Sequence, residues 1–329
     1  MAATVFITGS TGFVGSYLAH ELAHRGYRLR LLVRPTSHRE ALNQIPESQR
    51  EWIEGDLSDP LMLRDLIQQS EYVVHAAAMV SFWKKDAKRL FAVNVEGTAN
   101  VVNAALDSNI RKLLYVSSVA AVGRPPEGSI ELDETAKWSD EDATHDYAKT
   151  KHLAELEVWR GVAEGLPAVI LNPSLVLGRG DWNRSSLQVF RYIAEKNQFH
   201  PKGTVNYVDV RDVARMGAEL LENEITGERY IQNAGATSYR EFFHQTAEAM
   251  QRPDRSRPLP DWIAGLAWRW EALRSLLTQS PPKVTPQTLR SASQPHIYRS
   301  DKIRDTLRQD FRSLEETLQW VAEGYPKID

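Results

Sequence analysis

The chain of 329 residues contains no cysteine. This absence excludes disulfides, thiolate metal ligands and a cysteine nucleophile together. It is in keeping with a reducing compartment, and we expect a cytoplasmic protein. No apolar run approaches the ~20 residues that a membrane-spanning helix needs. No signal peptide is expected before the first strand, which begins almost at once, so we expect no membrane partner.

An excess of positive charge is also missing. The chain has 40 Lys and Arg against 43 Asp and Glu, a formal net charge of −3. This balance gives no support for a nucleic-acid partner. Hydrophobic residues make up 42% and charged residues 25%, as in ordinary globular proteins. The length suits one large domain, or one domain with a smaller lobe.

The opening segment has the strongest pattern in the sequence. Thr4–Thr8 is a short apolar run typical of a buried parallel strand, and a G-x-x-G-x-x-G triplet follows it directly before a helical pattern. Glycines permit a sharp strand-to-helix turn and let a phosphate approach the helix N-terminus. The alternative is a tight turn without a ligand. We expect a dinucleotide diphosphate at Gly9, Thr11, Gly12, Phe13, Val14 and Gly15.

Further strands alternate with amphipathic stretches along the chain. The predicted strands are 28–33, 52–54, 72–75, 112–117 and 168–171, and the predicted helical stretches are 60–69, 84–108 and 147–165. Such alternation predicts an α/β fold with a doubly wound parallel sheet. Ligands of these sheets bind at the carboxyl ends of the strands, so the residues just after each strand are candidate site residues.

Arg34 follows the second strand. Sites that prefer NAD usually place a carboxylate there to bind the ribose 2′-hydroxyl, but Val33 to Thr36 include none. A guanidinium pairs instead with a 2′-phosphate through charge-assisted hydrogen bonds. We therefore predict a preference for NADP(H), with NAD(H) also open. The alternative for Arg34 is a solvated surface residue.

Two other strand ends offer cofactor contacts. Asp56 could accept a hydrogen bond from the adenine amino group while Leu57 packs on the ring. Asp56 could equally begin a turn, with Ser58 or Asp59 capping the next helix. After the fourth strand, small side chains leave room for a flat ribose–nicotinamide unit, at Ala76, Ala77 and Ala78.

Two polar residues near these strand ends have framework interpretations. His75 lies inside a predicted strand, so we expect a packing role for it rather than a catalytic one. Asn94 and Gly97 run against helix propensity inside a long predicted helix. Gly97 indicates close packing on the sheet. Asn94 either bonds the active-site framework or is a buried amide satisfied by backbone.

Tyr147 and Lys151 are the chemically useful pair. They lie four residues apart at a helix start, so they share one face. A neighbouring ammonium favours a phenolate and would lower the phenol pKa from its usual ~10. A tyrosine tuned in this way can exchange a proton near neutral pH. Ser118, which follows the fifth strand, would polarise a substrate oxygen beside it.

Together these residues resemble the extended short-chain dehydrogenase/reductase superfamily, the NAD-dependent epimerase/dehydratase family. The resemblance rests on the residues already described and on three further segments, Ser117-Ser118, Asn172-Pro173-Ser174 and 208–214. It implies a Rossmann domain, a smaller C-terminal and mainly helical substrate lobe, and Ser118, Tyr147 and Lys151 as the catalytic trio. It also implies that Asn94, Ser117, Tyr147, Lys151, Pro173 and Ser174 contribute to the cofactor site.

Arg34 and the run from Asn172 to Gly178 bring the chain nearest the dihydroflavonol 4-reductase-like branch. Relatives that act on nucleotide sugars often have a glycine where this chain has His145. The resemblance gives a dinucleotide domain at 1–178, to which 204–232 returns, and a substrate lobe at 179–203 and 233–329.

The predicted substrate lobe is rich in aromatic residues. Trp262, Leu266, Trp270 and Leu273 follow helical spacing, which favours a core face or a subunit contact, so a homodimer is an option. The residues expected to line the substrate pocket are mostly apolar: Met79, Val80, Phe82, Val119, Ala120 and Trp182. They indicate an apolar or aromatic carbonyl substrate.

Three functions fit this sequence. The first is an NADP(H)-dependent oxidoreductase that reduces a ketone or aldehyde, with Tyr147 as proton donor. The second is a nucleotide-sugar epimerase or dehydratase that holds NAD tightly and uses the same trio. The third is a dinucleotide-binding regulatory protein without turnover, which the complete trio disfavours. We expect a small carbonyl or alcohol substrate and no metal site.

Overall fold

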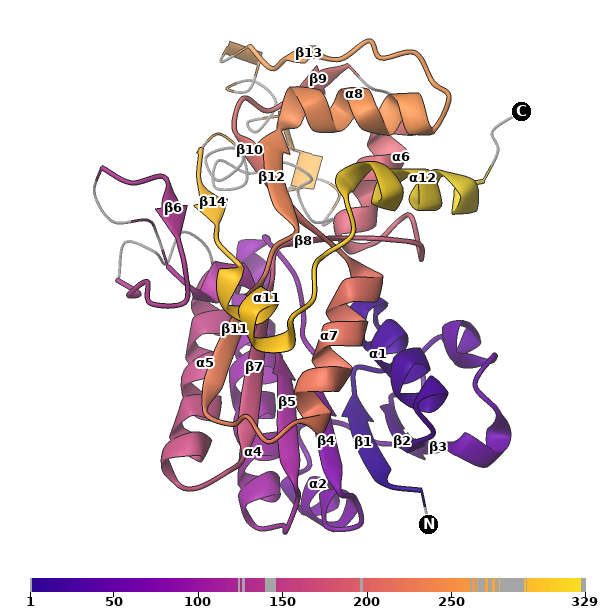
Figure 1. The fold of residues 1–329 in the computed structure, drawn as a ribbon, viewed down its shortest axis with the longest axis vertical. Helices are drawn as coiled ribbons and strands as arrows, with labels where there is room; N and C mark the ends of the chain where they lie inside the picture. Colours follow the sequence, from indigo (N-terminus) through magenta and orange to yellow (C-terminus); the bar gives the residue numbers. More distant parts are fainter. Residues whose placement is uncertain are drawn as a thin grey trace.

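The computed structural model describes residues 2–123, 125, 128–139, 146–195, 198–260, 262–263, 265, 270–271, 274–275, 278, 293 and 295–326. A seven-stranded sheet, parallel throughout, forms the lower part in Figure 1. Its strands, in spatial order, are β11 (Glu228–Gln232), β7 (Ala168–Pro173), β5 (Lys112–Val116), β4 (Tyr72–His75), β1 (Thr4–Thr8), β2 (Arg28–Val33) and β3 (Arg50–Glu54). The predicted doubly wound parallel sheet is confirmed.

The strand order reverses between β1 and β4, which places a ligand-binding crevice at their carboxyl ends. The predicted bounds hold for β1, β2 and β4. The strand β3 begins two residues earlier than predicted, β5 ends one residue earlier, and β7 continues to Pro173. The strand β11 was not predicted, because its partly polar run Glu228–Gln232 lacks the apolar pattern of the other strands.

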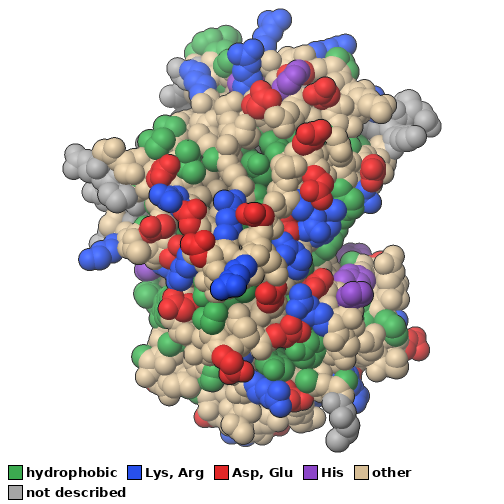
Figure 2. Space-filling model, viewed as in Figure 1, with side chains coloured by type: hydrophobic (Ala, Val, Ile, Leu, Met, Phe, Trp, Pro, Cys, Tyr) green, Lys and Arg blue, Asp and Glu red, His purple; other side chains and the backbone are tan. Residues whose placement is uncertain are grey.

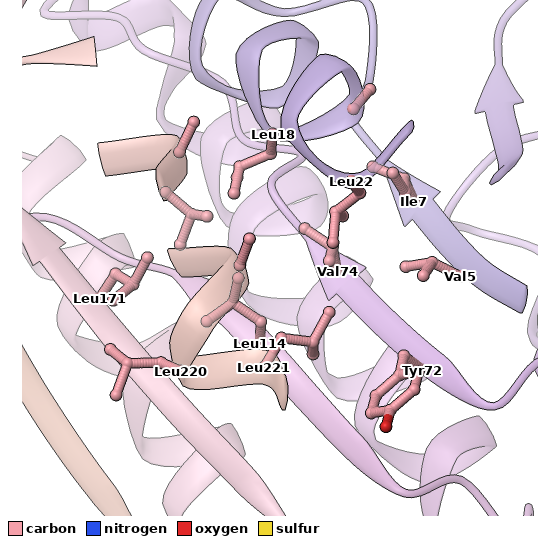
Figure 3. Packing of buried hydrophobic residues seen from close by; sticks show 14 of the residues in the cluster. Val5, Ile7, Leu18, Leu22, Tyr72, Val74, Leu114, Leu171, Leu220 and Leu221 are labelled. Carbon is pink, nitrogen blue, oxygen red and sulfur yellow. The ribbon is translucent and has the colours of Figure 1, made fainter. Parts of the chain in front are cut away.

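Helices cover both faces of the sheet because successive strand residues point to opposite sides. On one face, Val5 and Ile7 pack with α1 (Phe13–His24) and α7 (Val210–Glu222), as Figure 3 shows for Leu18, Leu22 and Leu220. On the other face, Phe6 packs with α2 (Pro60–Ile67), α4 (Gly97–Leu106) and α5 (Asp146–Ala163). The two clusters fix the strand ends and so the position of the crevice.

A second lobe lies above the carboxyl ends of the strands (Figure 1). Its small sheet has the order β12 (Gly235–Ser238), β10 (Thr204–Asp209), β8 (Leu175–Leu177). The helices α6 (Gln188–Glu195), α8 (Tyr239–Ala249) and α12 (Leu314–Gly324) pack on it around Phe190, Phe242 and Leu318. Of the segment expected to rejoin the first domain, α7 and β11 do so, whereas β10 pairs within the small sheet.

The C-terminal part of the chain joins the two lobes. The strand β14 (Ile297–Tyr298) pairs with β6 (Glu131–Leu132), and α11 (Asp301–Leu307) follows beside β11. A further short pair links β9 (Phe199–His200) and β13 (Arg257–Pro258). Figure 2 shows basic and acidic side chains interspersed on this face. This face therefore carries no single-sign charge patch.

Two predicted helices differ from expectation. The stretch 84–108 is not one helix: α3 (Ala87–Phe91) leads into a π-helical turn (Ala92–Glu96), and α4 follows. In the second lobe, Trp262 and Trp270 are each 68% exposed, so they are not core residues, and Leu266 and Leu273 lie outside the described residues. Within the described part of the chain, no helix has the length and apolarity to cross a membrane.

Candidate active site

The glycine turn is tight enough to require glycine. Gly9 has φ +71°, and a Cβ there would lie 2.5 Å from the backbone nitrogen of Ala77. A Cβ on Gly15 would lie 2.1 Å from the Gly9 carbonyl oxygen. Gly12 is the N-cap of α1 and has no side chain that could hydrogen-bond the first N–H groups of the helix, at Phe13 and Val14. This bare helix start fits a dinucleotide diphosphate.

The strand ends expected around the adenosine carry Arg34 and Asp56. The backbone of Arg34 forms a turn with Ser37, and the Arg34 side chain is exposed. Asp56 Oδ1 accepts hydrogen bonds from Ser58 N at 3.0 Å and Ser58 Oγ at 2.8 Å. These bonds lower the pKa of Asp56, and the charge of Arg34 lowers it further. Asp56 thus starts a turn, and Asp59 caps α2 by accepting from Met62 N.

Leu57 and Gly97 meet across the helix layer. A Cβ on Gly97 would lie 3.0 Å from Leu57 Cδ1, so this glycine packs on Leu57. The expectation that it packs on the sheet is wrong. The amide of Asn100 donates to the Leu57 carbonyl at 2.9 Å. The contact fixes the segment after β3 against α4, where Leu57 stays half-buried.

His75 is fully buried and has a framework role, in keeping with its expected packing. Its Nδ1 lies 2.6 Å from Thr8 Oγ1 and its Nε2 lies 2.9 Å from Thr98 Oγ1. Because the Thr98 hydroxyl donates to the Asn94 carbonyl, it must accept from Nε2–H, which assigns the neutral tautomer. Burial, with a smaller effect of the Lys151 charge, lowers the pKa of His75 to about 3.

Asn94 lies in the π-helical turn and clamps the loop after β4. Its Oδ1 accepts from Met79 N at 2.7 Å, and its Nδ2 donates to the Met79 carbonyl at 3.0 Å. The same Nδ2 donates to Thr150 Oγ1 at 3.1 Å, near the start of α5. Both interpretations of Asn94 hold, because the amide is satisfied by backbone and thereby ties the Ala76–Met79 segment to the helix of Tyr147.

Ser118 and Tyr147 are brought together at the carboxyl end of β5. Ser118 Oγ accepts from Ala120 N at 3.2 Å, and Ser118 also hydrogen-bonds Tyr147. Burial raises the pKa of Tyr147, and the bond with Ser118 offsets part of that effect. The expectation that Lys151 lowers this phenol pKa is wrong, because burial of the phenol raises it.

Lys151 lies at the base of the site and is only 1% exposed. Its Nζ donates to Tyr115 Oη and to the Val116 carbonyl, both at 2.9 Å. Burial lowers the pKa of Lys151 to about 7, and the negative charge of Glu155 opposes the shift. Sequence reasoning missed Tyr115. Its signal was its place in β5, two residues before Ser117 and so on the same side of the strand.

Glu155 is a second residue that the sequence analysis missed. This carboxylate is 1% exposed and accepts from Ser117 Oγ at 2.7 Å and from Asn172 Nδ2 at 2.8 Å. The hydroxyl of Ser117, expected at the cofactor, therefore points to α5. The available signal was a charged residue four positions after Lys151, on the same helix face.

The residues after β7 include a polar atom without a partner. Ser174 N donates to the Gln232 carbonyl at 3.0 Å, which ties the end of β7 to β11. Ser174 Oγ is buried and has no hydrogen-bond partner among the described residues. Buried hydroxyls are rarely left unpaired, so this atom fits a position that a bound polar group completes. The predicted cofactor role of Pro173 and Ser174 is compatible with it.

Apolar candidates for the substrate pocket divide into two groups. Phe82 contacts the Tyr147 ring edge-on at 6.0 Å. Trp182 instead packs in the second lobe, with ring distances of 6.1 Å to Phe190 and 5.0 Å to Tyr325. Its ring thus contributes to the lobe core.

Across the described residues, no three His, Asp or Glu side chains gather in a way that could hold a metal ion.

Comparison with known proteins places this site in a family. Residues 5–235 match the family described as "NAD dependent epimerase/dehydratase family". The chain belongs to this family. The predicted extended short-chain dehydrogenase/reductase resemblance is therefore confirmed, and the protein is an enzyme of the NAD(P)-dependent reductase and epimerase type.

Relatives of this family member include reductases. A "Putative dihydroflavonol 4-reductase" of Synechocystis sp. is 30% identical over 339 residues, covering 99% of this chain and 97% of that protein. Cinnamoyl-CoA reductase 1 of Oryza sativa subsp. japonica is 34% identical over 241 residues, 69% of this chain and 70% of that protein. The crystal structure of gox2253 superposes with a TM-score of 0.83 at 32% identity, covering 98% of this chain and 97% of that one.

Proposed function

We propose that this enzyme is an NADP(H)-dependent reductase of a ketone or aldehyde. The observation that carries the proposal is the position of Tyr147: its phenol is hydrogen-bonded to Ser118, which follows β5, and it shares one face of α5 with the buried Lys151. A phenol with a raised pKa stays in its acid form at neutral pH. Reduction of a carbonyl needs a proton donor, so this form suits reduction.

The residues of the crevice have distinct tasks in this reaction. Bound NADPH supplies the hydride. The glycine turn binds the diphosphate with its bare N–H groups. Ser118 hydrogen-bonds the carbonyl oxygen of the substrate, and Tyr147 gives that oxygen its proton. Lys151 contributes a positive charge below Tyr147, and its position orients the nicotinamide ribose.

Arg34 supports the choice of NADP(H). It follows β2 directly, its side chain is exposed, and no carboxylate stands in the segment from Val33 to Thr36. Two acidic groups at or just after the end of the neighbouring strand β3 have other hydrogen-bonded partners: Glu54 pairs with Arg39 at 2.7 Å, and Asp56 accepts a hydrogen bond from Ser58 at 2.8 Å. A guanidinium in this place favours a phosphate over a hydroxyl.

An apolar or aromatic carbonyl is the substrate class that fits best. Phe82 and Val80 lie on the loop that Asn94 clamps, and they are 41% and 51% exposed. Exposed apolar side chains beside a catalytic phenol gain from covering by an apolar ligand. Several relatives named as reductases support the same class of reaction.

The family description also favours a second function, a nucleotide-sugar epimerase or dehydratase with tightly held NAD. Mass spectrometry of the cofactor released from denatured protein separates the two. Exchangeable NADP(H), with NADPH consumption in a screen of aldehydes, β-diketones and aromatic ketones, supports the reductase. Retained NAD, with interconversion of a nucleotide sugar, would replace it by the second function.

A further inference from the structure

Glu155 lies one helical turn beyond Lys151 and two beyond Tyr147 on α5. The three side chains therefore share one face of the helix. Lys151 and Glu155 are each 1% exposed, so both groups are removed from water. Burial of a carboxylate costs free energy unless the group is paired and hydrogen-bonded. The partners of Glu155 therefore indicate its role.

Those partners come from three neighbouring strands. Glu155 Oε2 accepts from Ser117 after β5 and from Asn172 on β7. The same Asn172 amide also donates to the Ser118 carbonyl at 3.0 Å. On the other side, Glu155 Oε1 pairs with Arg229 of β11 at 3.2 Å. The carboxylate thus fixes the backbone of Ser118 through two routes.

The Arg229 side of this arrangement is itself anchored. The guanidinium donates to the carbonyl oxygens of Glu134 and Ala136, and Glu134 Oε1 accepts from Ile231 N at 2.8 Å. Arg229 lies on the side of Glu155 away from the strand ends, in a charged cavity of about 770 Å³ that Trp159 also lines. The ion pair therefore lies between solvent and the active site.

The charged groups around Lys151 are few. On β4, His75 is neutral at pH 7, because burial lowers its pKa to about 3. On β5, Tyr115 has a pKa raised well above its usual value, and Tyr147 on α5 also has a raised pKa, so both phenols stay protonated. Among the described groups that act on Lys151, Glu155 is the one that favours its charged form.

We propose that Glu155 is a positioning residue, whose carboxylate fixes Ser118 beside Tyr147 and whose negative charge favours the ammonium form of Lys151. This inference rests on the proposed function for its catalytic meaning. It deepens that function by naming the group that sets the pH range in which the trio works. The charge and the hydrogen bonds make separate, measurable contributions.

The first experiment measures Lys151 directly in the full-length, cofactor-free protein. Lysines are labelled at Cε with ¹³C, the Lys151 signal is assigned with Lys151→Arg, and its pKa is followed by NMR. In Glu155→Gln the amide keeps one acceptor oxygen but carries no charge. We expect the pKa of Lys151 to fall by about one unit, because an opposite charge has been removed. The control is Glu157→Gln, because the native Glu157 side chain pairs with Arg160 at 2.9 Å outside the site. This variant should leave the pKa of Lys151 unchanged.

A second variant separates charge from structure. Arg229→Met removes the partner of Glu155 but keeps the carboxylate. If the charge acts on Lys151, the pKa of Lys151 stays constant or rises in this variant. A merely structural role predicts that both variants disturb Lys151 in the same direction. An unchanged pKa in Glu155→Gln, or equal decreases in both variants, would overturn the proposal.

The second experiment is the pH profile of NADPH oxidation on an accepted carbonyl. In Glu155→Gln the alkaline loss of kcat/KM should move about one unit toward lower pH, since Lys151 deprotonates earlier. Glu157→Gln should keep the profile of the native enzyme. If the alkaline decrease of kcat/KM in Glu155→Gln stays at the same pH as in the native enzyme, the catalytic part of the proposal is wrong. A shifted NMR titration in a protein that turns over no carbonyl would keep the role of Glu155 and reject the proposed function.

Discussion

The ring of Phe82 lies edge-on to the ring of Tyr147, with centroids 6.0 Å apart, while 41% of Phe82 remains exposed. A large apolar side chain that contacts this tyrosine and stays open to solvent would gain from being covered, because burial of a phenyl ring is favourable by roughly 1.5 to 3 kcal/mol. The hydrogen bond from Met79 N to Asn94 Oδ1 fixes the loop that carries Phe82. The exposed ring is therefore in place to pack against a substrate.

Replacing Phe82 should weaken the binding of aromatic carbonyls. We expect Phe82→Ala to raise KM for an aromatic ketone by about tenfold or more, with a smaller effect for a short aliphatic aldehyde. Steady-state kinetics on the two substrates measure the difference. Phe91→Ala is the matched control: Phe91 is also 41% exposed, and the described residues show no ring contact between it and Tyr147. Equal losses on both substrates would argue against a packing role.

Replacing Arg34 should change the preference between the two cofactors. Arg34→Ala should raise the Kd of NADPH by about 10- to 100-fold, since a charge-assisted contact to the 2′-phosphate contributes roughly 1.5 to 3 kcal/mol. The Kd of NADH should change little. Fluorescence titration measures both constants. Arg39→Ala is the control, because Arg39 is already held by Glu54 at 2.7 Å. An equal increase in the Kd of NADPH and NADH would show that Arg34 does not bind the 2′-phosphate.

The sequence predicted those features that depend on local pattern. The run Thr4–Thr8 and the glycine triplet allow few conformations, so strand, turn and helix start followed directly. The helical spacing of Tyr147 and Lys151 likewise predicted their shared face. Glu155 was missed because its partners come from strands 17 to 74 residues away in sequence. Such pairing depends on strand order, which local patterns do not contain.

The pKa of the Tyr147 phenol was also beyond what local sequence patterns could predict. Spacing correctly placed Lys151 one helical turn after Tyr147 on the same helix, but it carried no information about burial, which dominates the pKa of both groups. The π-helical turn around Asn94 was also hidden, because a single extra residue in a helical turn leaves the apolar pattern almost unchanged. Long-range packing therefore decides the electrostatics of this site.

His75 should make the folded protein sensitive to acid. Its pKa is about 3 in the folded state, below the usual 6.5, so the unfolded state binds more protons between these values. Stability then decreases as pH falls from about 6.5 toward 3, by up to roughly 1.4 kcal/mol per pH unit from this one group. Urea unfolding at pH 7, 6 and 5 should show a shallower decrease for His75→Gln.

The exposed His24 of α1 provides the control for this measurement. His24→Gln should keep the pH dependence of the native protein. An identical slope for His75→Gln and the native protein would contradict the assignment of a neutral, buried His75.

The most direct test of the account is the turnover of Tyr147→Phe. This variant removes the hydroxyl and keeps the ring that contacts Phe82. We predict that NADPH-dependent reduction of an accepted ketone falls by at least about 100-fold, as expected for loss of a general acid, while the Kd of NADPH stays constant. Full turnover by Tyr147→Phe, with NADPH bound as tightly as before, would contradict the assignment of Tyr147 as the proton donor.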